Sequence, residues 1–113
     1  MYMFESYLKK IKSYPAVYLG SKNLIALSFM ISGYEEAIYD LTNKRILFNS
    51  KIQRFIEQKF ITEYKQTVHW SNFLLKNRSD EEAFDMFFEV FEEFKKRYPD
   101  WSELDWSEIS YAQ

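Results

Sequence analysis

Residues 79–97 read SDEEAFDMFFEVFEEFKKR, and this stretch decides the fold class. Its phenylalanines recur at intervals of three and four residues, which is the spacing of one face of an amphipathic helix. Ser79 and Glu82 are spaced as a capping box, and the basic residues at 95–97 lie where the helix dipole favours positive charge. The stretch therefore predicts a helix over residues 80–97 with a buried aromatic face.

The same spacing of apolar residues predicts helices on both sides of this stretch. They are expected at residues 3–12, 22–41, 50–60, 70–77 and 100–109. Two glycines and two prolines in 113 residues leave few turns, and no segment shows the alternating pattern of a strand. We therefore predict an all-α fold, a single-domain bundle of about five to six helices over residues 1–113.

Local signals also predict how these helices begin and how they are joined. Ser50 with Gln53 is spaced as a second capping box, and Asp100 is expected to cap the last helix with Glu103 in the reciprocal position. The segment that follows Pro15 is expected to be extended or turn-like, and a break is expected near residues 62–67.

The helix predicted at residues 22–41 carries apolar residues on more than one side. Its buried stripe is expected to consist of Leu27, Ile31, Tyr34, Ile38 and Leu41. Gly33 falls on a second stripe with Ala26 and Ala37. Glycine is about 1 kcal/mol less favourable than alanine inside a helix, so Gly33 predicts the close approach of a neighbouring element.

The net charge of −2 conceals a strong asymmetry along the chain. Residues 1–78 carry twelve Lys or Arg and six Asp or Glu, whereas residues 79–113 carry three and eleven. A surface of one sign attracts an oppositely charged partner and rejects like-charged ones. The acidic last third therefore predicts a basic partner, and direct binding of nucleic acid is not expected because this region repels phosphate.

The predicted partner-binding residues are carboxylates on the polar face of the 80–97 helix and the acidic and aromatic residues that follow it. They are Asp85, Glu89, Glu92, Glu93, Trp101, Glu103, Asp105 and Trp106. Five helical positions separate Trp101 from Trp106 by about 140°, so at least one indole is expected at the surface as a binding anchor. The alternatives are a solvated helix face for the carboxylates and an edge packed on the bundle for each tryptophan.

The sequence carries no recognisable catalytic or metal-binding motif. Cysteine is absent, and no glycine-rich phosphate loop is present. The only histidine, His69, has no glutamate three or four residues before it, so the common zinc and di-metal patterns are missing and a structural role is expected. We expect a protein that is not an enzyme and has no cofactor or metal, the alternative being a ligand pocket among the nine tyrosines.

Targeting signals are not apparent either. The first residues contain no apolar run of signal-peptide length, and nowhere do about 18 apolar residues run uninterrupted. Together with the absence of cysteine, this predicts a cytoplasmic protein without a membrane partner. Met1 and Met3 are both candidate start residues, and nothing in the sequence specifies an oligomeric state.

Two motifs near the start carry a family resemblance. Residues 14–24 read YPAVYLGSKNL and residues 29–34 read FMISGY, with His69-Trp70 and the Phe-rich acidic helix following later. Over residues 11–95 the chain resembles small bacterial immunity proteins of toxin systems, including contact-dependent growth inhibition. The resemblance implies a cognate protein toxin as the partner, and a nuclease in particular, because such toxins are frequently nucleases with basic clefts that an acidic surface can cover. It assigns no toxin-facing residues, and the alternative is an adaptor or regulatory subunit that binds another basic protein.

Overall fold

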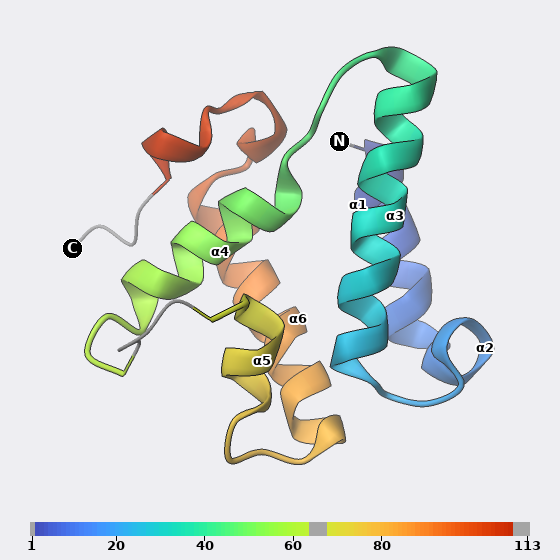
Figure 1. Cartoon of the computed structure of the whole chain (residues 1–113), viewed down its shortest axis with the longest axis vertical. Helices are drawn as coiled ribbons and strands as arrows, with labels where there is room; N and C mark the ends of the chain where they lie inside the picture. The colour runs from blue at the N-terminus through green and yellow to red at the C-terminus, as the bar shows by residue number, and fades with distance from the viewer. Residues whose placement is uncertain (1, 64–67, 110–113) are drawn as a thin grey trace.

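The computed structural model describes residues 2–63 and 68–109 (Figure 1). Their helices surround a core rich in aromatic rings. The helices are α1 (Tyr2–Ser13), α2 (Pro15–Leu19), α3 (Leu24–Thr42), α4 (Phe48–Lys59), α5 (Trp70–Leu75) and α6 (Asp80–Arg97). Two 3-10 turns follow, η1 (Trp101–Glu103) and η2 (Trp106–Glu108). No strand occurs in these two described segments, and the predicted all-α bundle of five to six helices is confirmed.

The helices form two groups that meet at the core. In Figure 1, α1 runs behind α3 along the longest axis with α2 at one end, while α4, α5 and α6 make up the other half. Tyr7 of α1 stacks on Tyr34 of α3 with ring centroids 4.8 Å apart. Phe48 of α4 lies at the centre, where its ring centroid is 4.9 Å from that of Phe4 and 5.5 Å from that of Phe91. One core thus joins the first helix to the last.

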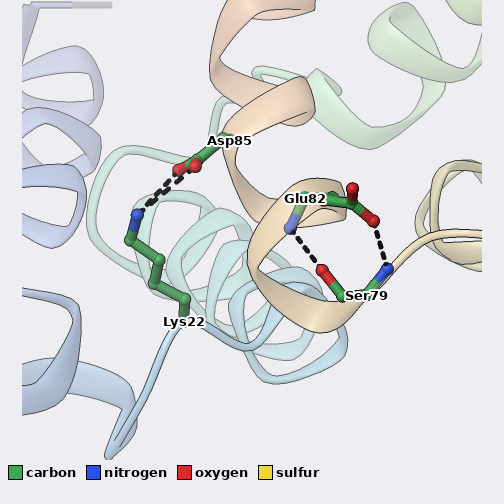
Figure 2. Close-up of polar contacts among 4 residues, drawn as sticks. All are labelled: Lys22, Ser79, Glu82 and Asp85. Carbon is green, nitrogen blue, oxygen red and sulfur yellow. Dashed lines mark hydrogen bonds and ion pairs between the residues drawn. The ribbon is translucent and has the colours of Figure 1, made fainter.

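The helix predicted from residues 80–97 is observed with these bounds as α6. Its aromatic face is buried, as predicted, through Ala83, Phe84, Phe87, Phe88, Val90, Phe91 and Phe94. The predicted capping box is also present (Figure 2). Ser79 Oγ accepts the Glu82 backbone N–H at 3.1 Å, and Glu82 Oε1 accepts the Ser79 backbone N–H at 2.8 Å. The Ser79 backbone N–H, as the largest cause, and the Ser79 side chain stabilise the ionised carboxylate and hold the pKa of Glu82 below its usual value.

Replacing Ser79 with alanine is expected to lower the free energy of unfolding by about 1 kcal/mol, because one helix N–H loses its acceptor. Urea denaturation followed by circular dichroism measures the loss. The matched control is Ser50→Ala, since Ser50 is exposed inside α4 and caps nothing in the described structure. Its change should stay within about 0.5 kcal/mol. Equal losses in the two variants contradict the cap at Ser79.

Four other predicted helices agree with α1, α3, α4 and α5 to within two residues at each end. The segment after the first helix is a correction, because residues 15–19 form α2 and are neither extended nor turn-like. Pro15 occupies the first turn of α2, where its fixed φ is compatible with a helix and its missing N–H costs nothing. Gly20, at φ 84°, then ends α2 in the left-handed conformation that glycine adopts freely.

The predicted capping box at Ser50 and Gln53 is wrong. Helix α4 begins two residues earlier, after Leu47, which stands at the N-cap position with φ 54° and provides no side-chain cap. The amide of Gln53 is used across the fold, where its Oε1 accepts the Trp70 backbone N–H at 2.8 Å and its Nε2 donates to the Val68 carbonyl at 2.9 Å. These contacts with a distant part of the chain could not be predicted from the local spacing of Ser50 and Gln53.

The last predicted helix, residues 100–109, is also wrong. The chain forms η1 and η2 instead, and Asp100 makes no side-chain cap bond. A capping box does occur, but at Asp105 and Glu108, where Glu108 Oε2 accepts the Asp105 backbone N–H at 2.9 Å. Of the break predicted at residues 62–67, residues 64–67 lie outside the described residues.

Two predictions for α3 are corrected by the burial of its residues. Leu27, Ile31 and Ile38 are buried as predicted, but Leu41 is 86% exposed. Gly33 is exposed, and a β-carbon built there would meet nothing within 4 Å. No element in the described part of this chain therefore makes the close approach to Gly33 that the sequence predicts.

Candidate functional site

The predicted site begins on the outward side of α6. Asp85, Glu89 and Glu92 are exposed there and Glu93 is half-buried. At 100° per residue these four positions fall within an arc of about 100°, opposite the buried phenylalanines. We call these four carboxylates the acidic α6 surface. Sequence reasoning placed them correctly on one side of the helix.

Lysines pair with three of the four carboxylates, which the sequence did not predict. Lys22 Nζ lies 3.1 Å from Asp85 Oδ1 (Figure 2), and Lys59 Nζ lies 2.7 Å from Glu93 Oε1. Lys95 Nζ lies 3.0 Å from Glu92 Oε2. Lys22 and Lys59 belong to the basic first part of the chain. The charge asymmetry of the sequence is therefore partly neutralised in the fold, which weakens the field that the sequence predicts.

These ion pairs remain accessible to a partner. The side chain of Asp85 is 55% exposed within its pair and that of Glu92 is 53% exposed. Exposed pairs of this kind contribute little net stability, with typical values of about 0–1 kcal/mol. An arginine on another protein could therefore replace the lysine at small cost. Glu89 has no cationic partner within 4 Å among residues 2–63 and 68–109.

Trp101 does not lie on the surface, which corrects its assignment as a binding anchor. It is 1% exposed, and its ring centroid lies 5.3 Å from that of Phe48 and 5.9 Å from that of Phe4. Its indole Nε1–H donates to Glu5 Oε2 at 3.3 Å. The chain turns back after α6 through η1 and inserts this indole into the core. Burial is therefore what its large apolar ring provides.

Trp106 is the exposed tryptophan, at 48%. The sequence predicted at least one exposed indole. The geometry differs from the prediction in that the two tryptophans lie on separate 3-10 turns and not on one helix. The Arg54 guanidinium of α4 lies 5.3 Å from the Trp106 ring centroid. Beside it, Asp105 Oδ1 accepts the Ser107 backbone N–H at 3.0 Å, and this bond lowers the pKa of Asp105. An ionised carboxylate thus stands next to the one exposed indole of the described residues.

Glu103 and Asp105 also lie near a buried cation. Lys51 of α4 is 2% exposed, and its Nζ donates to the Ser102 carbonyl at 3.4 Å. Burial lowers the pKa of Lys51, while the negative charges of Glu103, Asp105 and Glu35 raise it. The carboxyl-terminal carboxylates therefore compensate a lysine of α4. Of the eight predicted residues, four form the acidic α6 surface and Trp101 lies in the core. The other three, Glu103, Asp105 and Trp106, lie in the segment of η1 and η2 beside α4.

A groove beside the acidic α6 surface was missed by sequence reasoning. It lies between α1 and α6, has a volume of about 790 Å³, and brings Lys9, Lys12 and Lys95 next to Glu92. Lys12 Nζ lies 5.7 Å from the ring centroid of Phe88 on the groove wall. The sequence itself shows the lysines of α1 on the polar side of the first predicted helix. Their position along one edge of α6 follows only from the fold.

The tyrosine pocket that the sequence left as an alternative is not formed by this groove, because no tyrosine lines it. Tyr7 instead contacts Tyr34 and Tyr18, whose ring centroids lie 4.8 and 6.0 Å away. Burial and these neighbouring hydroxyls raise the pKa of Tyr7, with burial as the largest cause. These rings pack on each other at the junction of α1, α2 and α3.

His69 has the structural position that the sequence predicts. It is the N-cap of α5, where its Nδ1 accepts the Ser71 backbone N–H at 3.2 Å and lies 2.8 Å from Ser71 Oγ. Partial burial lowers the pKa of His69, so its neutral form is favoured. Within residues 2–63 and 68–109, no three acidic or histidine side chains gather as metal ligands.

None of the helices in the described residues combines the length and the apolar character needed to cross a membrane. Comparisons with protein-family models, curated proteins and solved structures find no match to this chain.

Proposed function

We propose that this chain is a non-enzymatic immunity protein that binds and neutralises a cognate bacterial toxin. The observation that carries the proposal is the acidic α6 surface, whose four carboxylates share one side of a helix and keep access to solvent. A surface of this charge fits a basic protein. The family resemblance of residues 14–34 adds the toxin as the class of partner, and a nuclease as its most specific form.

A partner can bind this surface if its own cationic side chains replace the lysines that pair with the carboxylates. Asp85, Glu92 and Glu93 are already held in position by lysines, so little side-chain entropy remains to be lost when an arginine of the toxin takes over the contact. Glu89, without such a lysine in the described structure, offers a direct contact. An arginine-rich nuclease cleft gains bidentate hydrogen bonds that the lysines cannot make.

Tight neutralisation also needs apolar anchors, since nanomolar affinity corresponds to about −12 kcal/mol. Trp106 is the candidate on this chain, because a half-exposed indole beside Asp105 can be buried by a partner that also meets the carboxylate. Lys9 and Lys12 add a basic edge along the α1–α6 groove. A toxin with acidic residues beside its basic cleft therefore fits better than a uniformly basic one.

The proposal is tested by co-expressing this protein with the toxin encoded by the gene immediately upstream. The wild-type chain should restore growth and copurify with that toxin. The double variant Glu89→Lys with Glu92→Lys should slow association about tenfold or more at low ionic strength and flatten its salt dependence, because electrostatic steering is lost. Stopped-flow or surface plasmon resonance measurements at two salt concentrations give these rates.

A single reversal, Glu89→Lys, is compared with Glu63→Lys, which changes the net charge equally at an exposed carboxylate outside α6. Only Glu89→Lys should slow binding strongly. Equal rates in these two variants exclude the acidic α6 surface as the docking face. Complex formation with a basic protein whose activity does not harm growth would favour the adaptor alternative, and the absence of both binding and protection rejects the proposed function.

A further inference from the structure

Arg54 of α4 is a cation whose hydrogen-bonding capacity the described chain does not use. Its guanidinium lies 5.3 Å from the Trp106 ring centroid, and its Nε is buried without a hydrogen-bond partner. Among residues 2–63 and 68–109, no carboxylate lies within 4 Å of it. Arginine keeps its charge and carries five N–H donors, and a buried donor without an acceptor lowers stability. The guanidinium is therefore open to an acceptor from another molecule.

A second arginine makes the same kind of aromatic contact but has a carboxylate as well. The Arg45 guanidinium lies 3.9 Å from the Tyr39 ring centroid, and its Nη1 donates to Glu36 Oε2 at 3.0 Å. A guanidinium that lies over a ring thus keeps its edge free for a carboxylate. Arg54 has the ring without the carboxylate, so the described part of the chain leaves its site incomplete.

The carboxylates nearest to Arg54 along the chain and along η2 bind other groups. Glu57, one helical turn later on α4, accepts a hydrogen bond from the Gln53 amide at 2.9 Å. In the capping box of η2, Asp105 Oδ1 accepts a backbone N–H of its own turn at 3.0 Å, and Glu108 Oε2 accepts the Asp105 backbone N–H at 2.9 Å. These contacts explain why none of the three carboxylates pairs with the guanidinium.

The aromatic half of the site is fixed in place and accessible. Trp106 is 48% exposed, and the capping box of η2 orients the turn that carries it. Arg54 is half-buried, and since its Nε is covered, an acceptor from outside the chain can reach only the terminal Nη atoms. Little conformational freedom is lost at such a site when a partner binds, which favours a tight contact.

The charges around the site favour a single carboxylate over a chain of phosphates. Glu103, Asp105 and Glu108 are exposed on the same segment as the indole, and they would repel a nucleic acid backbone. Lys51 of α4 balances part of the charge of Glu103 and Asp105. One carboxylate of a protein side chain can make a bidentate contact with the guanidinium and adds only one negative charge.

We propose that Arg54 and Trp106 form a binding site for an aspartate or glutamate side chain of the toxin. The carboxylate of the toxin binds the terminal nitrogens of Arg54, and the apolar atoms beside it cover the exposed part of the indole. The inference rests on the proposed function for the class of partner, but it does not require the toxin to contact the acidic α6 surface. It gives the toxin an acidic contact residue in addition to its basic ones.

This site should determine how long the complex lasts. A charged hydrogen bond that binding shields from water mainly slows dissociation, whereas exposed charges mainly change the association rate. Arg54→Gln should therefore accelerate dissociation about tenfold or more, with little change in association. Arg54→Lys keeps the charge but not the planar fork, so it should also accelerate dissociation. Surface plasmon resonance with the toxin encoded by the upstream gene measures both rates.

The matched control is Arg45→Gln, which removes the same charge from a guanidinium that already has its carboxylate. It should leave the dissociation rate unchanged. Urea denaturation of the three variants separates binding from stability. If Arg54 only held η2 on α4, Arg54→Gln would lower the urea midpoint and leave the dissociation rate of the complex at the wild-type value.

A double-mutant cycle identifies the carboxylate on the toxin. Each aspartate and glutamate of the toxin is changed to its amide and tested against both wild-type Arg54 and Arg54→Gln. For one of them, the two changes together should weaken binding no more than either change alone, because both remove the same contact.

The outcomes separate this inference from the proposed function. If the wild-type chain binds the toxin but Arg54→Gln dissociates at the same rate, or if no acidic residue of the toxin couples to Arg54, the inference is wrong and the proposed function is unaffected. A wild-type chain that neither binds the toxin nor protects against it rejects both. An RNA oligonucleotide that binds the wild-type chain and not Arg54→Gln assigns the site to phosphate and equally overturns the inference.

Discussion

Replacing Trp101 with alanine is expected to lower the free energy of unfolding by about 3–5 kcal/mol, a large share of the 5–15 kcal/mol typical of a domain. The indole is 1% exposed and packs among aromatic rings, with centroid distances of 5.3 Å to Phe48 and 6.0 Å to Phe94. Its removal leaves a cavity in a rigid aromatic core and takes the Nε1–H donor from Glu5. Urea denaturation followed by far-ultraviolet circular dichroism measures the change.

The matched control is Trp106→Ala, the same substitution five residues later. Trp106 is 48% exposed, so its loss should cost less than about 1 kcal/mol of stability. If Trp106 anchors the toxin, this variant should instead accelerate dissociation of the complex. A similar loss of stability in the two variants would contradict the division between a core tryptophan and a surface tryptophan.

Trp70→Ala is expected to destabilise the fold by a similar amount, about 3–5 kcal/mol, at the junction of α4, α5 and α6. The Trp70 ring is fully buried and stacks on Phe87 with centroids 4.9 Å apart. Its Nε1–H donates to Asn49 Oδ1 at 3.0 Å, and Asn49 Nδ2 in turn donates to Ser32 Oγ of α3 at 3.1 Å. The alanine removes the stacked ring and leaves the Asn49 oxygen without its donor.

The variant Trp70→Phe separates these two contributions. It keeps an aromatic ring against Phe87 but cannot donate to the partly buried Asn49, so the expected loss is at most about 1–3 kcal/mol, the cost of an unsatisfied buried acceptor. Thermal and urea unfolding of both variants measure the difference. Should Trp70→Phe be as destabilising as Trp70→Ala, the hydrogen bond would outweigh the packing, contrary to the expectation.

Local signals predicted the fold well where they coincide with the tertiary structure. Helix α6 was predicted with correct bounds because its start, its end and its buried face are all encoded within residues 79–97. The failures at Ser50 and Asp100 have one cause. A capping box requires only two residues at a fixed spacing, whereas the fold had other uses for Gln53 and for the segment around Trp101.

The candidate site was predicted only in part, because local signals again show only what is encoded within one helix. The outward direction of Asp85, Glu89 and Glu92 follows from helical periodicity, which the sequence contains. The lysines that pair with the carboxylates do not, since Lys22 lies 63 residues from Asp85. The exposure of Leu41 and of Gly33 could not be predicted, because the spacing of apolar residues along α3 does not show where the neighbouring helices end.

The contact between Trp101 and Glu5 spans 96 residues and joins the first helix to the turn after the last one. Together with Ile109, which has no exposed surface, it means that the core is closed only by residues 101–109. A chain still attached to the ribosome must therefore wait for these residues before it can fold stably. If the protein neutralises a toxin as proposed above, neutralisation would begin only after residues 101–109 have left the ribosome, and a protease that removes this segment would inactivate the protein without touching α6.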